Sequence, residues 1–156
     1  MKKLEHLSEI YSLYDTFIID LWGVMHNGIK LNSGALEVVE NLFNKKKRVV
    51  FLSNAPRPSK NVINFLKKLE MKEKYLNNVL TSGEAAIKSL KSQKFGKYFY
   101  HLGPLRDTSL FFGMEQNKTN IKDCDFILCT GLFDEHENLN FYKELFEYNI
   151  SKKLIC

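Results

Sequence analysis

The chain has 156 residues and a net charge of +5, and 44% of its residues are hydrophobic and 26% charged. This balance excludes an intrinsically disordered protein and fits one globular domain, or one domain with part of a second. No apolar stretch approaches the roughly 20 residues that cross a bilayer, and the N-terminus is too polar for a signal peptide, so we expect a cytoplasmic protein without a membrane partner.

The first predicted strand and helix lie within residues 16–47. Residues 16–21 (TFIIDL) form a short apolar run that soon meets a glycine, which predicts a buried strand. Residues 34–47 repeat apolar side chains at helical spacing, with Ser33 as the predicted N-cap. The densest basic run, 45–48, falls at the helix end, where cations complement the helix dipole. We therefore expect a solvated helix end and no nucleic-acid partner, with a basic binding surface as the alternative.

The alternation of strands and helices continues to about residue 90. Residues 48–52 (RVVFL) predict a second buried strand, and the helix that follows opens at Pro58 and Ser59. Residues 79–82 predict a short third strand, followed by a helix over 84–90. This order is typical of a parallel sheet covered by helices on both faces.

Polar side chains follow each predicted strand of the first half. They are Asp20, Ser53, Thr81 and Ser82. Because the carboxyl ends of parallel strands meet at one edge of a sheet, we expect an acid and hydroxyls to gather there. For Thr81 and Ser82, strand-end hydroxyls satisfied by local hydrogen bonds are the favoured interpretation. Asp20 has two possible interpretations. It either caps the turn by bonding backbone amides, or it is a functional carboxylate that needs a cation or metal nearby.

After about residue 92 the pattern changes. Residues 97–101 and 125–129 predict strands, 140–148 a helix, and 154–156 the start of another strand. The three cysteines, Cys124, Cys129 and Cys156, form no Cys-x-x-Cys pair, which favours a reducing compartment and offers no metal-site spacing. Because the sequence stops on an apolar strand, we expect it to be a fragment of a longer protein.

Four segments resemble a known family. The sequence DLWGVMHNG (20–28) resembles the first motif of haloacid dehalogenase (HAD) hydrolases, and FLSNAPRP (51–58) resembles the second motif of their class IIA, the NagD-like branch. LNSGALEVVENL (31–42) and TSGEAA (81–86) are similar to its intervening segments. The resemblance implies an α/β fold: the N-terminal part of a Rossmann-like core with a parallel sheet at 1–85, and the beginning of an inserted α/β cap domain at 86–156.

The resemblance also implies roles for individual residues. Asp20 would be the nucleophile that forms an aspartyl-phosphate, as carboxylates do in other enzymes. Its carboxylate and the backbone carbonyl of Trp22 would bind Mg²⁺, a hard ion that prefers oxygen ligands. Ser53 and the amide of Asn54 would bind the transferring phosphoryl group, and Gly23 lets the turn approach a ligand closely. The implied substrate of this phosphatase is a small phosphorylated metabolite.

Two departures from the family pattern bear on activity. The second aspartate that usually acts as general acid is replaced by Trp22, which cannot exchange a proton at neutral pH. His26 is the nearest substitute, with a structural turn histidine as the alternative. No segment matches the family's third motif, a lysine, or its fourth, the acidic residues that complete the Mg²⁺ site. We therefore expect weak or absent Mg²⁺ binding and turnover by residues 1–156 alone.

Two other functions follow from the same residues. A non-catalytic binding or interaction protein on a HAD scaffold is favoured by Trp22 and by the missing motifs. A receiver-like domain phosphorylated on Asp20 would need an acidic pair upstream of the strand, and Glu9 and Asp15 are poorly spaced for that role. The oligomeric state and the identity of the substrate are not encoded in any motif.

Overall fold

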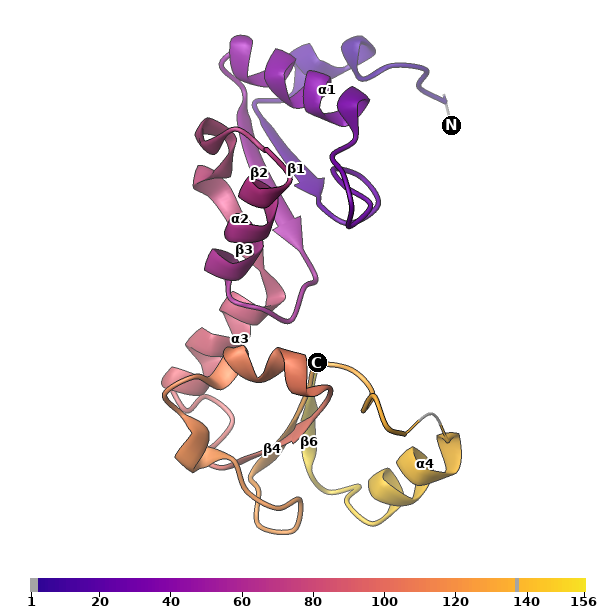
Figure 1. The fold of residues 1–156 in the computed structure, drawn as a ribbon, viewed down its shortest axis with the longest axis vertical. Coiled ribbons are helices and arrows are strands. Elements are labelled where there is room, and N and C mark those ends of the chain that lie inside the picture. The colour runs from indigo at the N-terminus through magenta and orange to yellow at the C-terminus, as the bar shows by residue number, and fades with distance from the viewer. Residues whose placement is uncertain (1–2, 137) are drawn as a thin grey trace. The chain divides into compact units, whose positions relative to one another are not determined.

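The computed structural model describes residues 3–136 and 138–156. The chain divides into two compact units, residues 1–54 with 59–81 and residues 55–58 with 82–156. In the described residues each unit contains a three-stranded parallel sheet (Figure 1). No helix in this part of the chain is both long and apolar enough to cross a membrane.

The first unit begins with two 3-10 turns, η1 (Leu7–Glu9) and η2 (Tyr11–Leu13). The sheet then follows in the order β1-β2-β3, with all neighbours parallel. Its strands are β1 (Thr16–Asp20), β2 (Arg48–Ser53) and β3 (Val79–Thr81). The connections carry α1 (Ser33–Asn44), α2 (Ser59–Lys68) and the 3-10 helix η3 (Glu73–Asn78).

The two faces of this first sheet differ in burial. α1 packs on β2 and α2 on β3, and right-handed crossovers that advance in one direction place both helices on one face. That covered face carries Phe17, Ile19, Val49, Phe51, Ser53, Val79 and Thr81. The opposite, open face exposes Ile18 (68%), Leu52 (49%) and Leu80 (50%). The expected cover on both faces is therefore wrong for this sheet within the described residues.

Three helices end in the same way, with a residue other than glycine at positive φ. Lys46 (φ 55°), Glu70 (φ 68°) and Gln93 (φ 50°) each follow a helix within a few residues. After α1, the Lys46 amide donates to the Phe43 carbonyl and the next amide to that of Leu42, which is the hydrogen-bond pattern of a Schellman motif. This turn ends α1 at Asn44, three residues before the predicted end at residue 47.

The second unit contains a sheet of order β4-β5-β6, again parallel. Its elements are α3 (Ser82–Lys91), β4 (Phe99–Leu102), the 3-10 helices η4 (Leu105–Phe111) and η5 (Glu115–Asn117), β5 (Phe126–Cys129), α4 (Leu139–Glu147) and β6 (Lys153–Ile155). Strands were predicted at all three positions, and the helix over 140–148 corresponds to α4.

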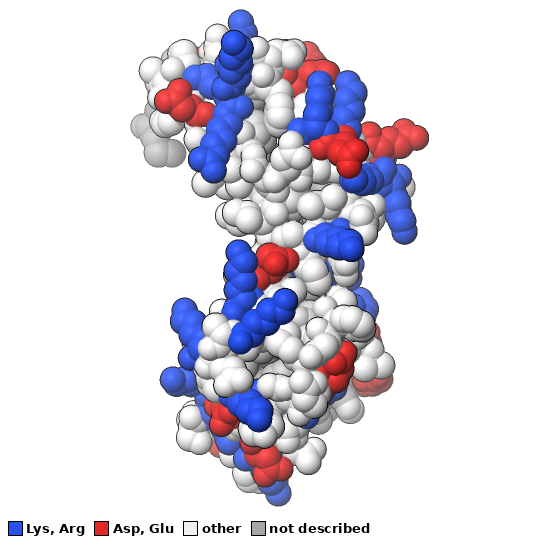
Figure 2. Space-filling view, turned by 90° about the vertical axis from the view of Figure 1, so that its left-hand side faces the viewer, with Lys and Arg blue, Asp and Glu red and all other residues white. Residues whose placement is uncertain are grey.

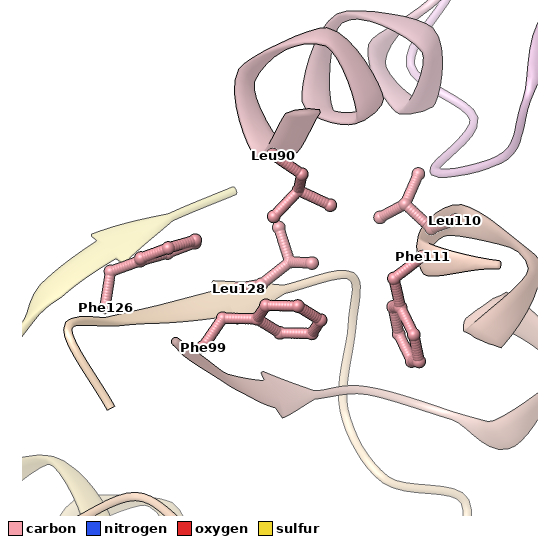
Figure 3. Close-up of a cluster of buried hydrophobic side chains, with 6 residues drawn as sticks. All are labelled: Leu90, Phe99, Leu110, Phe111, Phe126 and Leu128. Carbon is pink, nitrogen blue, oxygen red and sulfur yellow. The ribbon is translucent and has the colours of Figure 1, made fainter. Parts of the chain in front are cut away.

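Both faces of this second sheet are covered. On one face Leu90 from α3 and Leu110 and Phe111 from η4 pack against Phe99, Phe126 and Leu128 (Figure 3). On the other face Tyr142 from α4 packs with Leu102, Cys124 and Ile127. The alternation along β5 thus places successive side chains in two separate clusters.

The predicted N-cap of α1 is displaced by one residue. The Asn32 side chain accepts hydrogen bonds from the amides of Gly34 (3.1 Å) and Ala35 (3.4 Å), so Asn32 is the N-cap and Ser33 is the first helical residue. Both residue types are good caps, and the sequence alone does not distinguish two adjacent candidates. The basic run 45–48 begins directly after α1, as expected.

Candidate functional site

Asp20 is the last residue of β1, and its side chain is exposed. One carboxylate oxygen, Oδ1, accepts a hydrogen bond of 2.7 Å from the amide of Leu21. Asp20 thus does bond a backbone amide at the turn, as the capping interpretation predicts, but it is also presented to solvent at the carboxyl end of the sheet. This is the edge where ligands bind in open parallel sheets.

Ser53 ends the neighbouring strand β2. Asp20 is in register with Leu52, so Ser53 lies one position further along, and its side chain is 6% exposed. Because side chains alternate along a strand, Asp20 belongs to the open face and Ser53 to the covered face. Asn54 follows directly and is exposed. The structure therefore brings the predicted nucleophile and the predicted phosphate-binding residues to one edge of the first unit.

The turn after Asp20 is held by backbone hydrogen bonds. The amide of Gly23 donates to the His26 carbonyl (2.8 Å), and the amide of Met25 donates to the Leu21 carbonyl (2.8 Å). Gly23 has φ +78°, in the region that favours glycine, and a Cβ built there would meet no other atom within 4 Å. The backbone at Gly23 is therefore open to close approach, and its role at a ligand site stays a prediction.

Trp22 lies over Gly28. A Cβ at Gly28 would come within 2.8 Å of the Trp22 Cη2 atom, and Gly28 has φ +89°. The backbone conformation favours glycine at this position, and a side chain there would have to displace the indole ring of Trp22. The Trp22 side chain remains 63% exposed, on the turn where the family pattern has an aspartate.

His26 is enclosed by aromatic rings. It is 6% exposed, and its ring makes edge-to-face contacts with Trp22 (5.4 Å between centroids) and Phe65 (5.2 Å). Its Nδ1 accepts a hydrogen bond from the amide of Gly28 (3.1 Å). Burial lowers the pKa of His26, and the negative charge of Asp20 opposes that shift. These contacts favour the structural alternative for His26, a neutral imidazole that fixes the turn.

Two oxygen donors of the turn were predicted as magnesium ligands. The Asp20 carboxylate and the Trp22 backbone carbonyl are hard oxygen donors on adjacent segments of the turn, which suits Mg²⁺ chemically. Mg²⁺ takes about six oxygen ligands, however, usually including several waters. No group of three or more His, Cys, Asp or Glu side chains in the described residues is placed to hold a metal ion.

The other predicted strand-end hydroxyls have local partners. Thr81 is 4% exposed, and its Oγ1 lies 3.3 Å from the Ser59 hydroxyl. The Ser82 hydroxyl donates to the Ala55 carbonyl at 3.1 Å. These partners confirm the interpretation of both as satisfied structural hydroxyls.

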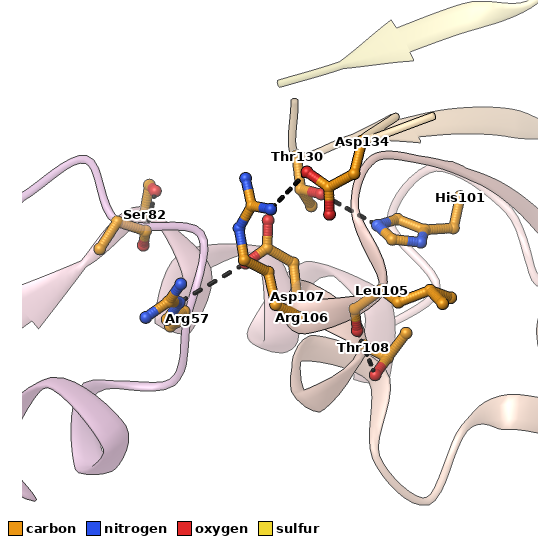
Figure 4. Close-up of polar contacts among 10 residues, drawn as sticks. Arg57, Ser82, His101, Leu105, Arg106, Asp107, Thr108, Thr130 and Asp134 are labelled. Atoms are coloured by element: carbon orange, nitrogen blue, oxygen red, sulfur yellow. Dashed lines mark hydrogen bonds and ion pairs between the residues drawn. The ribbon is translucent and has the colours of Figure 1, made fainter. Parts of the chain in front are cut away.

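The second unit contains a polar cluster that the sequence did not predict (Figure 4). Arg57 Nε lies 3.5 Å from Oδ1 of Asp107, a carboxylate whose residue is only 3% exposed. His101, also 3% exposed, shares a hydrogen bond of 2.9 Å with the Thr130 hydroxyl. Arg57 and Asp107 are 50 residues apart, and His101 and Thr130 are 29 apart, so no local sequence pattern predicts these contacts.

A glycine also fixes the segment that carries Arg57. A Cβ at Gly83 would lie 2.3 Å from the Arg57 backbone nitrogen, and Gly83 donates its amide to the Ala55 carbonyl (3.1 Å). Only glycine allows the segment 55–58 to lie against the start of α3. The TSGEAA segment therefore has a packing role that its hydroxyls alone do not suggest.

A cavity of about 430 Å³ lies in the first unit, away from Asp20. It is lined by the N-terminal 3-10 turns and by α1, including His6, Tyr11, Glu37 and Lys45. None of the residues predicted to carry chemistry contributes to its lining. The cavity therefore adds nothing to the candidate site.

Charged side chains of both signs share the face shown in Figure 2, where acidic residues lie among the basic ones. Two of the ion pairs involve Glu40, which contacts Lys72 (3.1 Å) and Lys74 (3.7 Å). Within the basic run, Lys47 pairs with Asp15 at 3.5 Å, which fits solvated surface charge at a helix end. The absence of a nucleic-acid partner stays a prediction.

Comparison with known proteins identifies similar chains. A family model described as haloacid dehalogenase-like hydrolase matches residues 17–126. No curated protein matches the sequence at a significant level. A haloacid dehalogenase-like family hydrolase from Brucella suis 1330 is 27% identical with a TM-score of 0.83, over 98% of this chain and 59% of that protein.

Two other solved structures share the fold at lower identity. NagD from E. coli K-12 is 20% identical with a TM-score of 0.60, over 88% of this chain and 53% of its own. A glycerol phosphate phosphatase from Mycobacterium tuberculosis, solved in complex with magnesium, is 22% identical with a TM-score of 0.55, over 79% of this chain and 38% of its own. The chain thus spans at most about three fifths of the length of these three proteins.

Proposed function

Since the chain belongs to the haloacid dehalogenase-like hydrolase family, we propose that it is a member of the NagD-like class IIA branch and that it supplies the nucleophile and the phosphate-binding residues of a phosphatase. The match to the family model confirms the predicted superfamily. The proposed substrate is a small phosphorylated metabolite. The observation that carries the proposal is the pair of adjacent strand ends, where exposed Asp20 follows β1 and Ser53 ends β2.

The proposed reaction begins with Asp20. Its Oδ1 is held by the Leu21 amide, and its second oxygen attacks the phosphorus atom of the substrate. The bond from phosphorus to the leaving oxygen breaks, and the electron pair stays on that oxygen. Water then hydrolyses the aspartyl-phosphate and returns the free carboxylate. The Ser53 hydroxyl and the Asn54 amide would donate hydrogen bonds to the phosphoryl oxygens, where charge develops during transfer.

The leaving oxygen needs a proton from another source. Trp22 has no titratable group, and His26 is buried between two rings with Nδ1 already accepting a hydrogen bond. General acid catalysis typically contributes about 10²–10⁴-fold in rate. We therefore propose a substrate whose leaving group needs little protonation, or turnover that is slow by this factor.

Magnesium is the proposed cofactor of the longer protein. The Asp20 carboxylate and the Trp22 carbonyl would be two of its oxygen ligands, and the bound ion would offset negative charge on the phosphoryl group. We propose that this chain is a fragment, so that residues 1–156 alone bind Mg²⁺ weakly or not at all. Isothermal titration of residues 1–156 with Mg²⁺ tests this point, and tight binding would contradict it.

The decisive test is a phosphatase screen on the product of the complete open reading frame. Asp20→Asn should lower hydrolysis of small phosphate monoesters by at least about 10³-fold, because the amide is a poor nucleophile. Asp15→Asn is the matched control, since Asp15 is an exposed carboxylate just before β1 that forms an ion pair with Lys47 at 3.5 Å. Equal activity in the wild type and in Asp20→Asn would remove Asp20 as the nucleophile.

A binding protein without catalysis is the second candidate function. The exposed indole of Trp22, at the position of the usual acid, is the observation that favours it. Such a protein would bind phosphate esters through Ser53 and Asn54 without forming a covalent intermediate. A beryllofluoride adduct on Asp20, detected by mass spectrometry, would count against this alternative.

A further inference from the structure

Two cysteines occupy equivalent positions at the ends of neighbouring strands in the second unit. Leu128 of β5 is in register with Ile155 of β6, and the next residues along the two parallel strands are Cys129 and Cys156. Residues at equivalent positions of paired strands point to the same face. Their Cα atoms are expected about 4.8 Å apart, within the range of about 4.4–6.8 Å that disulfides span.

The strand register places the two cysteines side by side, and they differ in exposure. Both cysteines are free, and the Cys129 thiol donates a hydrogen bond to the Gly131 carbonyl at 3.8 Å. Cys156 is exposed and Cys129 is half-buried. Burial is the main cause that raises the pKa of the Cys129 thiol, and the neighbouring Cys156 raises it further. Cys156 is thus the more accessible thiol, and Cys129 lies where it can act second.

We propose that Cys129 and Cys156 are a redox modification site, in which a reversible disulfide links the carboxyl ends of β5 and β6. The oxidant is a low-molecular-weight disulfide such as oxidised glutathione. The Cys156 thiolate attacks one sulfur, and one glutathione thiolate leaves with the electron pair. The Cys129 thiolate then attacks the mixed disulfide and displaces the second glutathione. The two cysteines lose two protons and two electrons, which the two glutathione molecules carry away.

The disulfide would secure a strand that otherwise has one partner. Within the described residues β6 pairs only with β5, and it contains three residues. Adjacent in-register strands hold Cβ atoms slightly further apart than the 3.5–4.5 Å a relaxed disulfide prefers. Strained disulfides are more easily reduced, so we expect the link to open and close rather than to persist.

The third cysteine provides an internal control. Cys124 is 2% exposed, and its thiol donates to the Ile121 carbonyl at 3.2 Å. It precedes β5 (Phe126–Cys129) and is separated from that strand by the bend at Asp125. Cys124 is therefore buried and lies away from the strand ends where the register pairs Cys129 with Cys156.

The test is a thiol titration of residues 1–156, equilibrated in glutathione buffers with an increasing ratio of oxidised to reduced glutathione. After denaturation, maleimide labelling should show that two of the three thiols are lost together, and mass spectrometry should find the peptides of Cys129 and Cys156 joined. Cys124→Ala should behave like the wild type. In the Cys129→Ser variant the reaction should stop at a mixed disulfide of Cys156 with glutathione. In the Cys156→Ser variant Cys129 should remain largely reduced.

Three outcomes would overturn the proposal. All three thiols could stay free in fully oxidised buffer, the wild type could accumulate only a glutathione adduct, or non-reducing electrophoresis could show disulfide-linked dimers instead. Circular dichroism of each serine variant establishes that it is folded before titration, so that a lost reaction is not mistaken for a lost fold.

Discussion

His101 is a buried imidazole at the carboxyl side of β4, bonded to Thr130 and in contact with the Phe111 ring (5.0 Å between centroids). Burial lowers its pKa to about 4, nearby Lys118 also lowers it, and Asp107 partly opposes the shift. The folded protein therefore holds His101 neutral at pH values where the unfolded chain, with a histidine pKa of about 6.5, already binds a proton.

This difference predicts a loss of stability in mild acid. The contribution of His101 is complete above about pH 6.5 and is lost as the pH falls toward 4, by up to about 3 kcal/mol in the free energy of unfolding. Urea unfolding at pH 7, 5 and 4 measures it. The double variant His101→Phe, Thr130→Val removes both polar partners, so its stability should depend less on pH. An identical pH dependence in variant and wild type would exclude His101 as the cause.

Single residues differ in how far the sequence predicts them. Asp20 and Ser53 were predicted because each directly follows or ends an apolar strand, and strand ends of a parallel sheet share one edge. The pairs Arg57–Asp107 and His101–Thr130 were missed, because their contacts depend on how distant segments pack. The local enclosure of His26 depends partly on Phe65, which follows it by 39 positions and belongs to α2.

At the scale of elements, the helix ends carry avoidable strain. Lys46, Glu70 and Gln93 occupy the left-handed conformation that glycine adopts without cost. Their amide hydrogen bonds belong to the backbone and would survive a change of side chain. At the turns that end α1, α2 and α3, the sequence therefore has a residue other than glycine in a backbone conformation that favours glycine.

Replacing these residues by glycine should stabilise the protein. We expect Lys46→Gly, Glu70→Gly and Gln93→Gly each to raise the free energy of unfolding by about 0.5–1 kcal/mol, since relief of the left-handed penalty exceeds the added chain entropy. Thermal or urea unfolding measures the change. Lys88→Gly, an exposed site inside α3, is the control and should destabilise by a similar amount. Destabilisation by all four substitutions would show that the turns are not strained.

Strand positions were predicted better than helix ends and 3-10 segments. The apolar β-branched runs of β1, β2 and β5 identify strands by composition alone. The end of α1 was placed too late because Lys45 and its neighbours are good helix formers, and a polar residue at positive φ gives no signal. The 3-10 helix η4 was missed because its seven residues carry no long periodic pattern.

At the scale of the whole molecule, the two sheets differ in cover. Within residues 3–136 and 138–156, helices lie on both faces of the sheet in the second unit, whereas one face of the first sheet is open. The near-continuous apolar sequence of β1 and β2 is typical of strands buried on both sides, which explains why cover on both faces was expected. Ile18, Leu52 and Leu80 form an exposed apolar surface on neighbouring strands.

The open face should bind apolar dyes. Replacing Ile18, Leu52 and Leu80 together by threonine should lower anilinonaphthalene sulfonate fluorescence, because threonine keeps strand propensity while removing apolar area. The midpoint of thermal unfolding should change little, since all three side chains are about half exposed or more. Ile150→Thr is the control: this residue is 89% exposed outside the sheet, and its loss should leave the fluorescence nearly unchanged. Undiminished fluorescence in the triple variant would locate the dye elsewhere.

Because Asp20 and Ser53 come from opposite faces of the sheet, β1 and β2 tolerate only certain deletions. The carboxylate comes from the open face of β1 and the hydroxyl from the covered face of β2, and both reach the same rim only because the strands keep their register. Removing one residue from either strand would invert every side chain beyond the deletion, exchanging core for surface. Removing two would restore the faces and only shorten the strand. Viable length variants in these strands are therefore expected to differ by even numbers of residues.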